Sequence, residues 1–264
     1  MVAFIKMKNI RQKTRTVNPM EDYYRGYSLI TSDTSNCLLE REKVVQKYVA
    51  GEKILDIGCG TGKNALIIKN KKLYGVDLSR KNLKTALKRG YFKVKLVDVS
   101  TQKLPFPDKI FDTVVSLETL EHLFDPIHAL AEANRVMKFG GRIIISTPNI
   151  GWIFCRLALL MGIFCDFHDF QLVPCHLRFF TIKRLSKLLL QTGFKLEKVV
   201  GTTDFVSRVP FQKLMNALAR LYPSLFASNP LLIAKKVSLP KTRKSIYYQI
   251  SGPAEGIANL FRFG

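Results

Sequence analysis

The feature that most constrains this chain is a glycine-rich turn that follows a short apolar segment. The segment Lys53–Gly58 is apolar enough to be a buried strand. It leads into Asp56-Ile-Gly58-Cys-Gly60-Thr-Gly62, where glycine recurs at every second position. Glycine tolerates positive φ and lets a ligand approach the backbone closely. This arrangement predicts an α/β domain with a ligand site at the end of its first strand.

Apolar segments and helical segments alternate along most of the chain. We expect strands at 53–58, 72–78, 93–99, 111–117, 142–146, 194–200 and 230–237. We expect helices at 38–49, 62–70, 79–89, 126–137, 151–165 and 181–192. Alternation at this spacing implies a mostly parallel sheet covered on both faces. The predicted fold is therefore a Rossmann-like seven-stranded sheet with helices on both faces.

Acidic residues end the first three predicted strands. The spacing of the turn is G-x-G-x-G and not the G-x-G-x-x-G that cradles a pyrophosphate, and Asp56 suits a ligand with positive charge. Asp77 comes 21 residues after Asp56, a separation expected of an acid that holds a ribose diol. Asp98 is placed to accept a hydrogen bond from an adenine amino group. The three acids together fit a nucleoside with a cationic tail.

These motifs, between Lys53 and Asn149, resemble those of class I S-adenosylmethionine-dependent methyltransferases. The matching stretches are Ile54–Gly62, Tyr74–Ser79, Asp98 with Leu104–Pro107 and Phe111-Asp112, Glu118, Glu121-His122, Asp125-Pro126 and Arg135–Gly141. The resemblance implies S-adenosylmethionine as the cofactor, held by Asp56, Gly58, Cys59, Gly60, Gly62, Asp77, Leu78, Asp98, Val99 and Leu117. Asp56 and the glycine backbone would bind the methionine part, and Asp77 would bind the ribose. Leu78, Asp98 and Val99 would contact the adenine, and Leu117 would lie beside the sulfonium.

Two histidines are candidate catalytic residues, because methylation of a hydroxyl is helped by a base. His122 follows the predicted fourth strand, near the expected position of the methyl group, and His176 precedes the helix at 181–192. We expect no metal site, because Cys165, His168, Cys175 and His176 have no standard zinc-site spacing.

The acceptor is constrained only by weaker patterns. Ser146–Asn149, an apolar helix and then His176-x-Arg178-Phe are similar to ubiquinone-biosynthesis O-methyltransferases, which favours an oxygen of a small-molecule, glycan or lipid-linked acceptor. A tRNA methyltransferase of the wobble-uridine type is an alternative, and a non-catalytic methyltransferase-like scaffold is another. The sequence names no particular acceptor.

The chain is strongly basic, with a formal net charge of +22. We expect a basic N-terminal arm at 1–20, a methyltransferase domain at 21–237 and a basic C-terminal tail at 238–264. Within the domain, the cofactor core covers about 53–149 and an acceptor-side or lid segment about 150–181. Such charge attracts polyanions, so peripheral association with anionic membranes is one prediction, and RNA binding stays open.

The cysteines and the longest apolar run bear on where the protein works. Five cysteines without a CxxC pair predict reduced thiols and a cytoplasmic protein. The apolar run 152–165 is too short to span a bilayer. Projected on a helix it is apolar all round, so it is either buried or meets an apolar partner. The predicted location is therefore cytoplasmic, with contact at the membrane surface.

Overall fold

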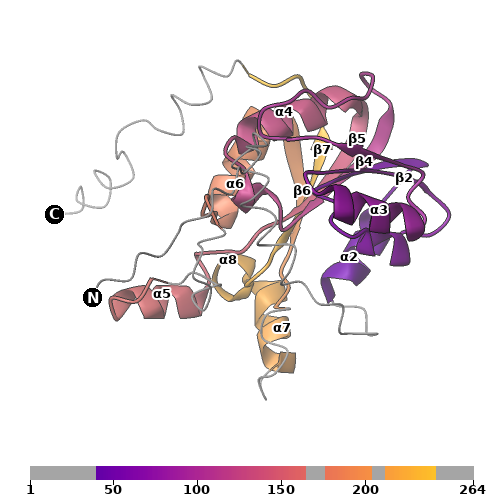
Figure 1. Ribbon diagram of the computed structural model, residues 1–264. Helices are drawn as coiled ribbons and strands as arrows, with labels where there is room; N and C mark the ends of the chain where they lie inside the picture. Colours follow the sequence, from indigo (N-terminus) through magenta and orange to yellow (C-terminus); the bar gives the residue numbers. More distant parts are fainter. Residues whose placement is uncertain (1–39, 165–175, 204–211, 242–264) are drawn as a thin grey trace, which may run out of the picture.

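The structure, a computed structural model, describes residues 40–164, 176–203 and 212–241. Its centre is a seven-stranded sheet in the order β3-β2-β1-β4-β5-β7-β6 (Figure 1). The strands are β1 (Lys53–Ile57), β2 (Lys72–Asp77), β3 (Lys93–Leu96), β4 (Phe111–Leu117), β5 (Met137–Ser146), β6 (Phe194–Val200) and β7 (Leu231–Lys236). All neighbours are parallel except β7, which is antiparallel to both β5 and β6. The predicted fold class is confirmed.

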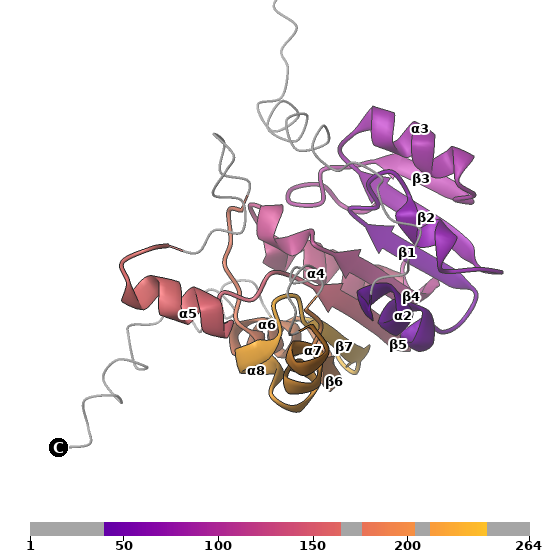
Figure 2. The same cartoon turned by 90° about the horizontal axis from the view of Figure 1, so that it is seen from below.

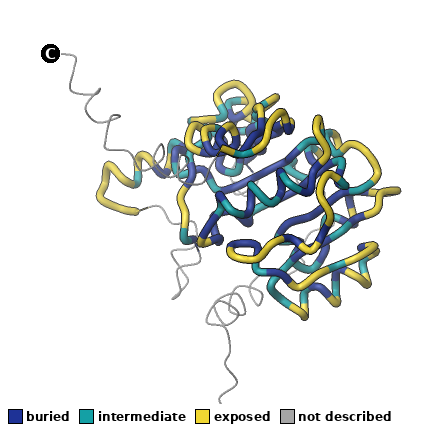
Figure 3. Tube along the Cα trace, turned by 90° about the horizontal axis from the view of Figure 1, so that it is seen from above, coloured by how far each residue is buried: buried dark blue, intermediate teal, exposed yellow. Residues whose placement is uncertain are grey.

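Successive side chains of the central strands enter two separate cores, because a strand points its residues to opposite faces. Leu55 and Ile57 belong to the core that contains Leu130 of α4 (Pro126–Val136) and Leu185 of α6 (Ile182–Gln191). Ile54 belongs to the other core, which is completed by α2 (Glu40–Tyr48) and α3 (Arg80–Lys88). The strands form the buried centre of the molecule (Figure 3). Helices therefore cover both faces of the sheet, as predicted.

Three helices begin at side-chain caps that the sequence indicates. Ser79 accepts a hydrogen bond from the backbone of Asn82 at the start of α3. Asp125 caps α4 in the same way, and Thr181 caps α6. Such caps satisfy backbone N–H groups that have no partner within the helix. The remaining helices are α5 (Ile153–Leu160), α7 (Gln212–Leu221) and α8 (Pro223–Phe226).

The predicted helix at 62–70 is wrong. The segment forms only a short 3₁₀ helix, η1 (Lys63–Leu66), which starts at Gly62 in the left-handed conformation. The chain must reverse at Asn70, where φ is 58°, to enter β2 two residues later. Too few residues remain between these two turns for a longer helix. By contrast, β5 is longer than predicted, because Met137 already pairs with Phe111 of β4.

The predictions about the basic ends of the chain, the apolar run and the cysteines differ in how far the structure tests them. The basic arm at 1–20 and all but the first residues of the tail at 238–264 lie outside the described residues. Within the described ranges, no helix is long and apolar enough to cross a membrane. Cys155 in α5 is disulfide-bonded, so the expectation that all five cysteines are reduced is wrong for this residue.

Candidate functional site

A cavity of about 330 Å³ opens at the carboxyl ends of β1, β2 and β4. This edge of a parallel sheet is where α/β proteins bind their ligands, at the point where the strand order reverses. β1 lies between β2 and β4, so the cavity lies at that reversal. Its walls combine the loop after β1, the end of β2 and the segment after β4. Residues predicted for the cofactor that line it are Gly58, Cys59, Gly60, Asp77, Leu78, Val99 and Leu117.

The loop after β1 brings its backbone close to this cavity. The N–H groups of Gly58 and Cys59 donate to the carbonyl of Val76 in β2, which ties the loop to the sheet. A Cβ on Gly58 would lie 2.4 Å from Oγ1 of Thr119, so there is no room for a side chain at this position. A Cβ on Gly60 would meet nothing within 4 Å, although the backbone there has a φ of +52°. Gly60 therefore faces open space in the cavity, and a ligand can approach its backbone directly.

Asp77 connects the end of β2 to the glycine loop. One carboxylate oxygen accepts a hydrogen bond from the N–H of Gly60 at 2.9 Å, and the other accepts from the N–H of Ser79 at 2.8 Å. Burial raises the pKa of this carboxyl above its ordinary value, and the two backbone donors counteract that shift. A carboxylate oxygen has a second lone pair, so Asp77 can also accept hydrogen bonds from a hydroxyl in the cavity.

Asp56 is not among the residues that line the cavity. Its carboxylate accepts hydrogen bonds from the amide of Asn64, at 2.9 Å, and from the hydroxyl of Tyr91. Burial raises its pKa to about 6, against the lowering effect of these two donors. Asp56 thus holds η1 and the segment after α3 against β1. Its contact with the methionine part of the cofactor stays a prediction.

Two further predicted cofactor residues also lie outside the cavity wall. Gly62 has a φ of +82°, and a Cβ there would lie 2.7 Å from the backbone of Ala86 in α3. Asp98 accepts hydrogen bonds from the N–H of Ser100 and the hydroxyl of Thr101, and so shapes the loop after β3. Gly62 therefore permits close packing of α3 on the turn. The predicted contact of Asp98 with adenine is not tested by this geometry.

Apolar side chains form another part of the wall. Leu78 and Val99 line the cavity together with Val97. An aromatic base is stabilised by such flat apolar contacts, as are most ligands in small-molecule sites. Leu117 at the end of β4 and Cys59 in the glycine loop also line the cavity. Burial raises the pKa of the Cys59 thiol well above its ordinary value, so this cysteine stays protonated and acts as an apolar wall.

Sequence reasoning missed the contribution of α2. Arg41 and Glu42 line the cavity although they precede the first strand. Arg41 lies 3.6 Å from the carboxylate of Glu118, whose backbone has a φ of +48°. Glu118 also accepts hydrogen bonds from Ser146 and Asn229. A non-glycine residue in the left-handed region costs about 1–2 kcal/mol, and such residues gather at functional sites. No local sequence pattern indicates that α2 lies beside the segment after β4, because this contact exists only in the folded protein.

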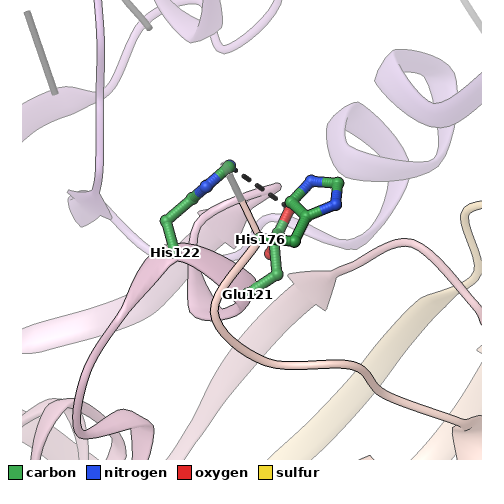
Figure 4. A group of neighbouring side chains, drawn as sticks. All are labelled: Glu121, His122 and His176. Carbon is green, nitrogen blue, oxygen red and sulfur yellow. Dashed lines mark ion pairs between the residues drawn. The ribbon is translucent and has the colours of Figure 1, made fainter. Parts of the chain in front are cut away.

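The two predicted catalytic histidines meet beside the cavity. His122 ends the 3₁₀ helix η2 (Leu120–His122) and lines the cavity, whereas His176 does not line it. Their ring centroids are 5.0 Å apart. Glu121 lies between them, with one carboxylate oxygen 3.9 Å from Nε2 of His122 (Figure 4). All three side chains are buried. The structure therefore brings His176 next to Glu121 and His122, which lie more than 50 positions before it in the sequence.

The comparisons with known proteins agree with this geometry. Residues 55–145 match the family model described as a methyltransferase domain. A probable S-adenosylmethionine-dependent methyltransferase of Mycolicibacterium smegmatis is 30% identical over 63% of this chain and 62% of its own length. The ubiquinone biosynthesis O-methyltransferase of Thiobacillus denitrificans is 31% identical over 59% of this chain and 69% of its own length.

A solved structure shares the fold. An S-adenosylmethionine-dependent methyltransferase of Thermotoga maritima, described as a possible histamine N-methyltransferase, has a TM-score of 0.53 and 21% identity to this chain. The two structures match over 81% of this chain and 91% of the Thermotoga maritima protein. The chain belongs to the class I S-adenosylmethionine-dependent methyltransferase superfamily, and S-adenosylmethionine is its cofactor. The open space at Gly60, the spare hydrogen-bond acceptors of Asp77 and the apolar wall fit this cofactor.

Proposed function

We propose that this chain transfers a methyl group to an oxygen atom of a small-molecule, glycan or lipid-linked acceptor. The observation that carries the proposal is the position of His122, which lines the cofactor cavity beside Leu117 and Thr119. When bound, S-adenosylmethionine supplies a methyl group that is already activated on a sulfonium. The protein therefore needs chiefly to align the acceptor and to remove its proton.

The residues that line the cavity divide these tasks. The backbone at Gly58 and Gly60 would hold the methionine part, and Asp77 would accept hydrogen bonds from the ribose. Leu78 and Val99 would pack against the base. His122 would face the hydroxyl of the acceptor, and His176, which lies behind it with a ring-centroid distance of 5.0 Å, would help to position it. In the transfer the oxygen forms a bond to the methyl carbon, and the bond from carbon to sulfur breaks with its electron pair left on sulfur. The hydroxyl proton passes to solvent on the side of the cavity that His122 lines.

Labelled cofactor distinguishes this proposal from its alternatives. The purified chain is incubated with methyl-tritiated S-adenosylmethionine and a fractionated cell extract, and Gly60→Arg is the inactive control. We expect label in the small-molecule, glycan or lipid fraction, where it is bound as a methyl ether or methyl ester. Label in the RNA fraction would instead support a tRNA methyltransferase. Cofactor binding without label in any fraction would support a non-catalytic scaffold.

We also propose that helix α5 brings the enzyme to an anionic membrane surface. Cys155 is buried, but the helix exposes Leu157 and Leu160, and Met161 follows them with 70% of its surface exposed. In two views α5 lies at the periphery of the molecule, away from the sheet (Figures 1 and 2). The net charge of +22 complements an anionic leaflet, where each basic residue near the surface contributes about 1 kcal/mol.

Vesicle co-sedimentation at two salt concentrations tests this second proposal. We expect the full chain to bind vesicles that contain phosphatidylglycerol, to bind vesicles of pure phosphatidylcholine less, and to lose affinity as salt rises. The double variant Leu160→Asp and Met161→Asp should weaken binding. Leu221→Asp is the matched control, because Leu221 on α7 is 71% exposed and apolar. Equal loss in the control, or no binding at low salt, would overturn the proposal.

A further inference from the structure

The cluster of Glu121, His122 and His176 offers one ligand atom from each side chain, and these three atoms all lie within 4.8 Å of one another. The ligand atoms of a tetrahedral zinc site lie roughly 3.4 Å apart, given bonds of about 2.1 Å. Small rotations of the three side chains are therefore enough to close such a site. One carboxylate and two imidazoles form a common set of protein ligands for zinc and for other divalent transition metals.

Glu121 supplies the independent observation that a cation belongs here. It is 2% exposed, and neither of its carboxylate oxygens has a hydrogen-bond partner among the described residues. A buried carboxylate without hydrogen-bond donors is costly, and a metal ion is one of the few groups that compensate for it.

The backbone holds the three residues in place. Glu121 and His122 are neighbours in η2, and the carbonyl of Glu121 accepts hydrogen bonds from the N–H groups of Leu177 and Arg178. The guanidinium of Arg178 donates to the carbonyl of Phe124, which ties the same segment to the end of η2. These bonds set His176 across from His122 (Figure 4). The cluster is thus built by main-chain contacts on both sides and not by side-chain packing alone.

We propose that Glu121, His122 and His176 bind one divalent transition-metal ion at the wall of the cofactor cavity. This inference rests on the proposed function for its chemistry and defines how the histidine pair acts on the acceptor. His122 lines the cavity, so an ion bound to it has a coordination position within reach of the acceptor hydroxyl. The ion would lower the pKa of that hydroxyl, as it does for bound water. The proton leaves to solvent, the oxygen attacks the methyl carbon, and the sulfur keeps the electron pair of the broken bond.

Metal binding can be measured without any turnover. The full chain is freed of metal with a chelator and titrated with Zn²⁺, Mn²⁺ or Mg²⁺ salts alone, using a chromophoric competitor for Zn²⁺ and electron paramagnetic resonance for Mn²⁺. We expect about one equivalent of Zn²⁺ or Mn²⁺ per chain, and weaker binding of Mg²⁺, which prefers oxygen ligands. Glu121→Gln and His176→Gln should each weaken Zn²⁺ binding at least about tenfold.

The controls separate this inference from the proposed function. His128→Gln is the matched variant, because the ring of His128 contacts the carbonyl of Gln102 outside the cluster. It should bind Zn²⁺ like the wild type. Glu121→Gln should still bind S-adenosylhomocysteine, which shows that it folds. No Zn²⁺ or Mn²⁺ binding by the wild type, or equal binding by the wild type, Glu121→Gln and His176→Gln, would overturn the metal site. Neither result would decide the proposed methyl transfer, which the assay with labelled cofactor tests independently.

Discussion

Gly60→Ala separates the role of the glycine loop in binding from its role in folding. The backbone at Gly60 has a φ of +52°, a region that costs an alanine about 1–2 kcal/mol. The added Cβ meets no protein atom within 4 Å, so no steric cost adds to this strain. We therefore expect the free energy of unfolding to fall by only about 1–2 kcal/mol. The methyl group enters the space where the cofactor approaches the backbone, so binding should weaken at least about tenfold, or about 1.4 kcal/mol.

Isothermal calorimetry with S-adenosylhomocysteine measures the binding, and urea unfolding measures the stability. Gly162→Ala is the control, because its φ is +75°, its Cβ also meets nothing within 4 Å, and it does not line the cavity. It should lose similar stability and bind the cofactor product like the wild type. Gly58→Ala should instead lose more stability, because its Cβ would clash with Thr119. Wild-type affinity in Gly60→Ala would refute the placement of the cofactor against this loop.

Three further predictions follow from single side chains. Asp77→Asn replaces one acceptor oxygen with a donor group that faces a backbone N–H, so calorimetry should show S-adenosylhomocysteine bound about 10- to 100-fold more weakly, with Asp108→Asn on the exposed surface as an unaffected control. Because the folded-state pKa of Asp56 is about 6 against an ordinary 3.8, the stability that its neutral form provides is complete below about pH 4 and is lost as pH rises through 6. The unfolding free energy of the wild type relative to Asp56→Asn, measured with urea, should thus decline by about 2 to 2.5 kcal/mol between pH 4 and 7, and a flat difference would contradict the burial of this charge. Lys236→Met leaves the carbonyls of Asn134 and Met137 without their buried donor and should cost about 2–4 kcal/mol in unfolding free energy, whereas an unchanged melting temperature would show that these bonds contribute little.

The sequence predicts most of the sheet because local patterns determine it. The bounds of β4 and β6 agree with the apolar segments at 111–117 and 194–200. The caps at Ser79, Asp125 and Thr181 are likewise local signals, since each acts on a backbone group three residues away. The helix at 62–70 fails because the turn at Asn70 depends on where β2 must begin in the sheet. Local propensity does not contain that requirement.

The candidate site divides in the same way. The sequence predicts Gly60 from the glycine spacing after β1 and Asp77 from its place at the end of β2, and both line the cavity. Each signal is local, because it lies within or directly after one strand. Asp56 carries the same sequence signal but turns to Asn64 and Tyr91, a choice set by packing between segments. The contribution of α2 and the meeting of Glu121 with His176 depend on contacts across the fold. Sequence analysis therefore predicted two histidines as separate candidates and expected no metal.

Direct titration of the purified wild-type chain tests the central claim of a cofactor site for S-adenosylmethionine. Calorimetry should show one-to-one binding of both S-adenosylmethionine and S-adenosylhomocysteine, and Gly60→Arg should abolish it by filling the cavity. NAD, whose pyrophosphate finds no G-x-G-x-x-G turn here, should give no heat of binding. Binding of NAD together with no response to S-adenosylmethionine would contradict the account.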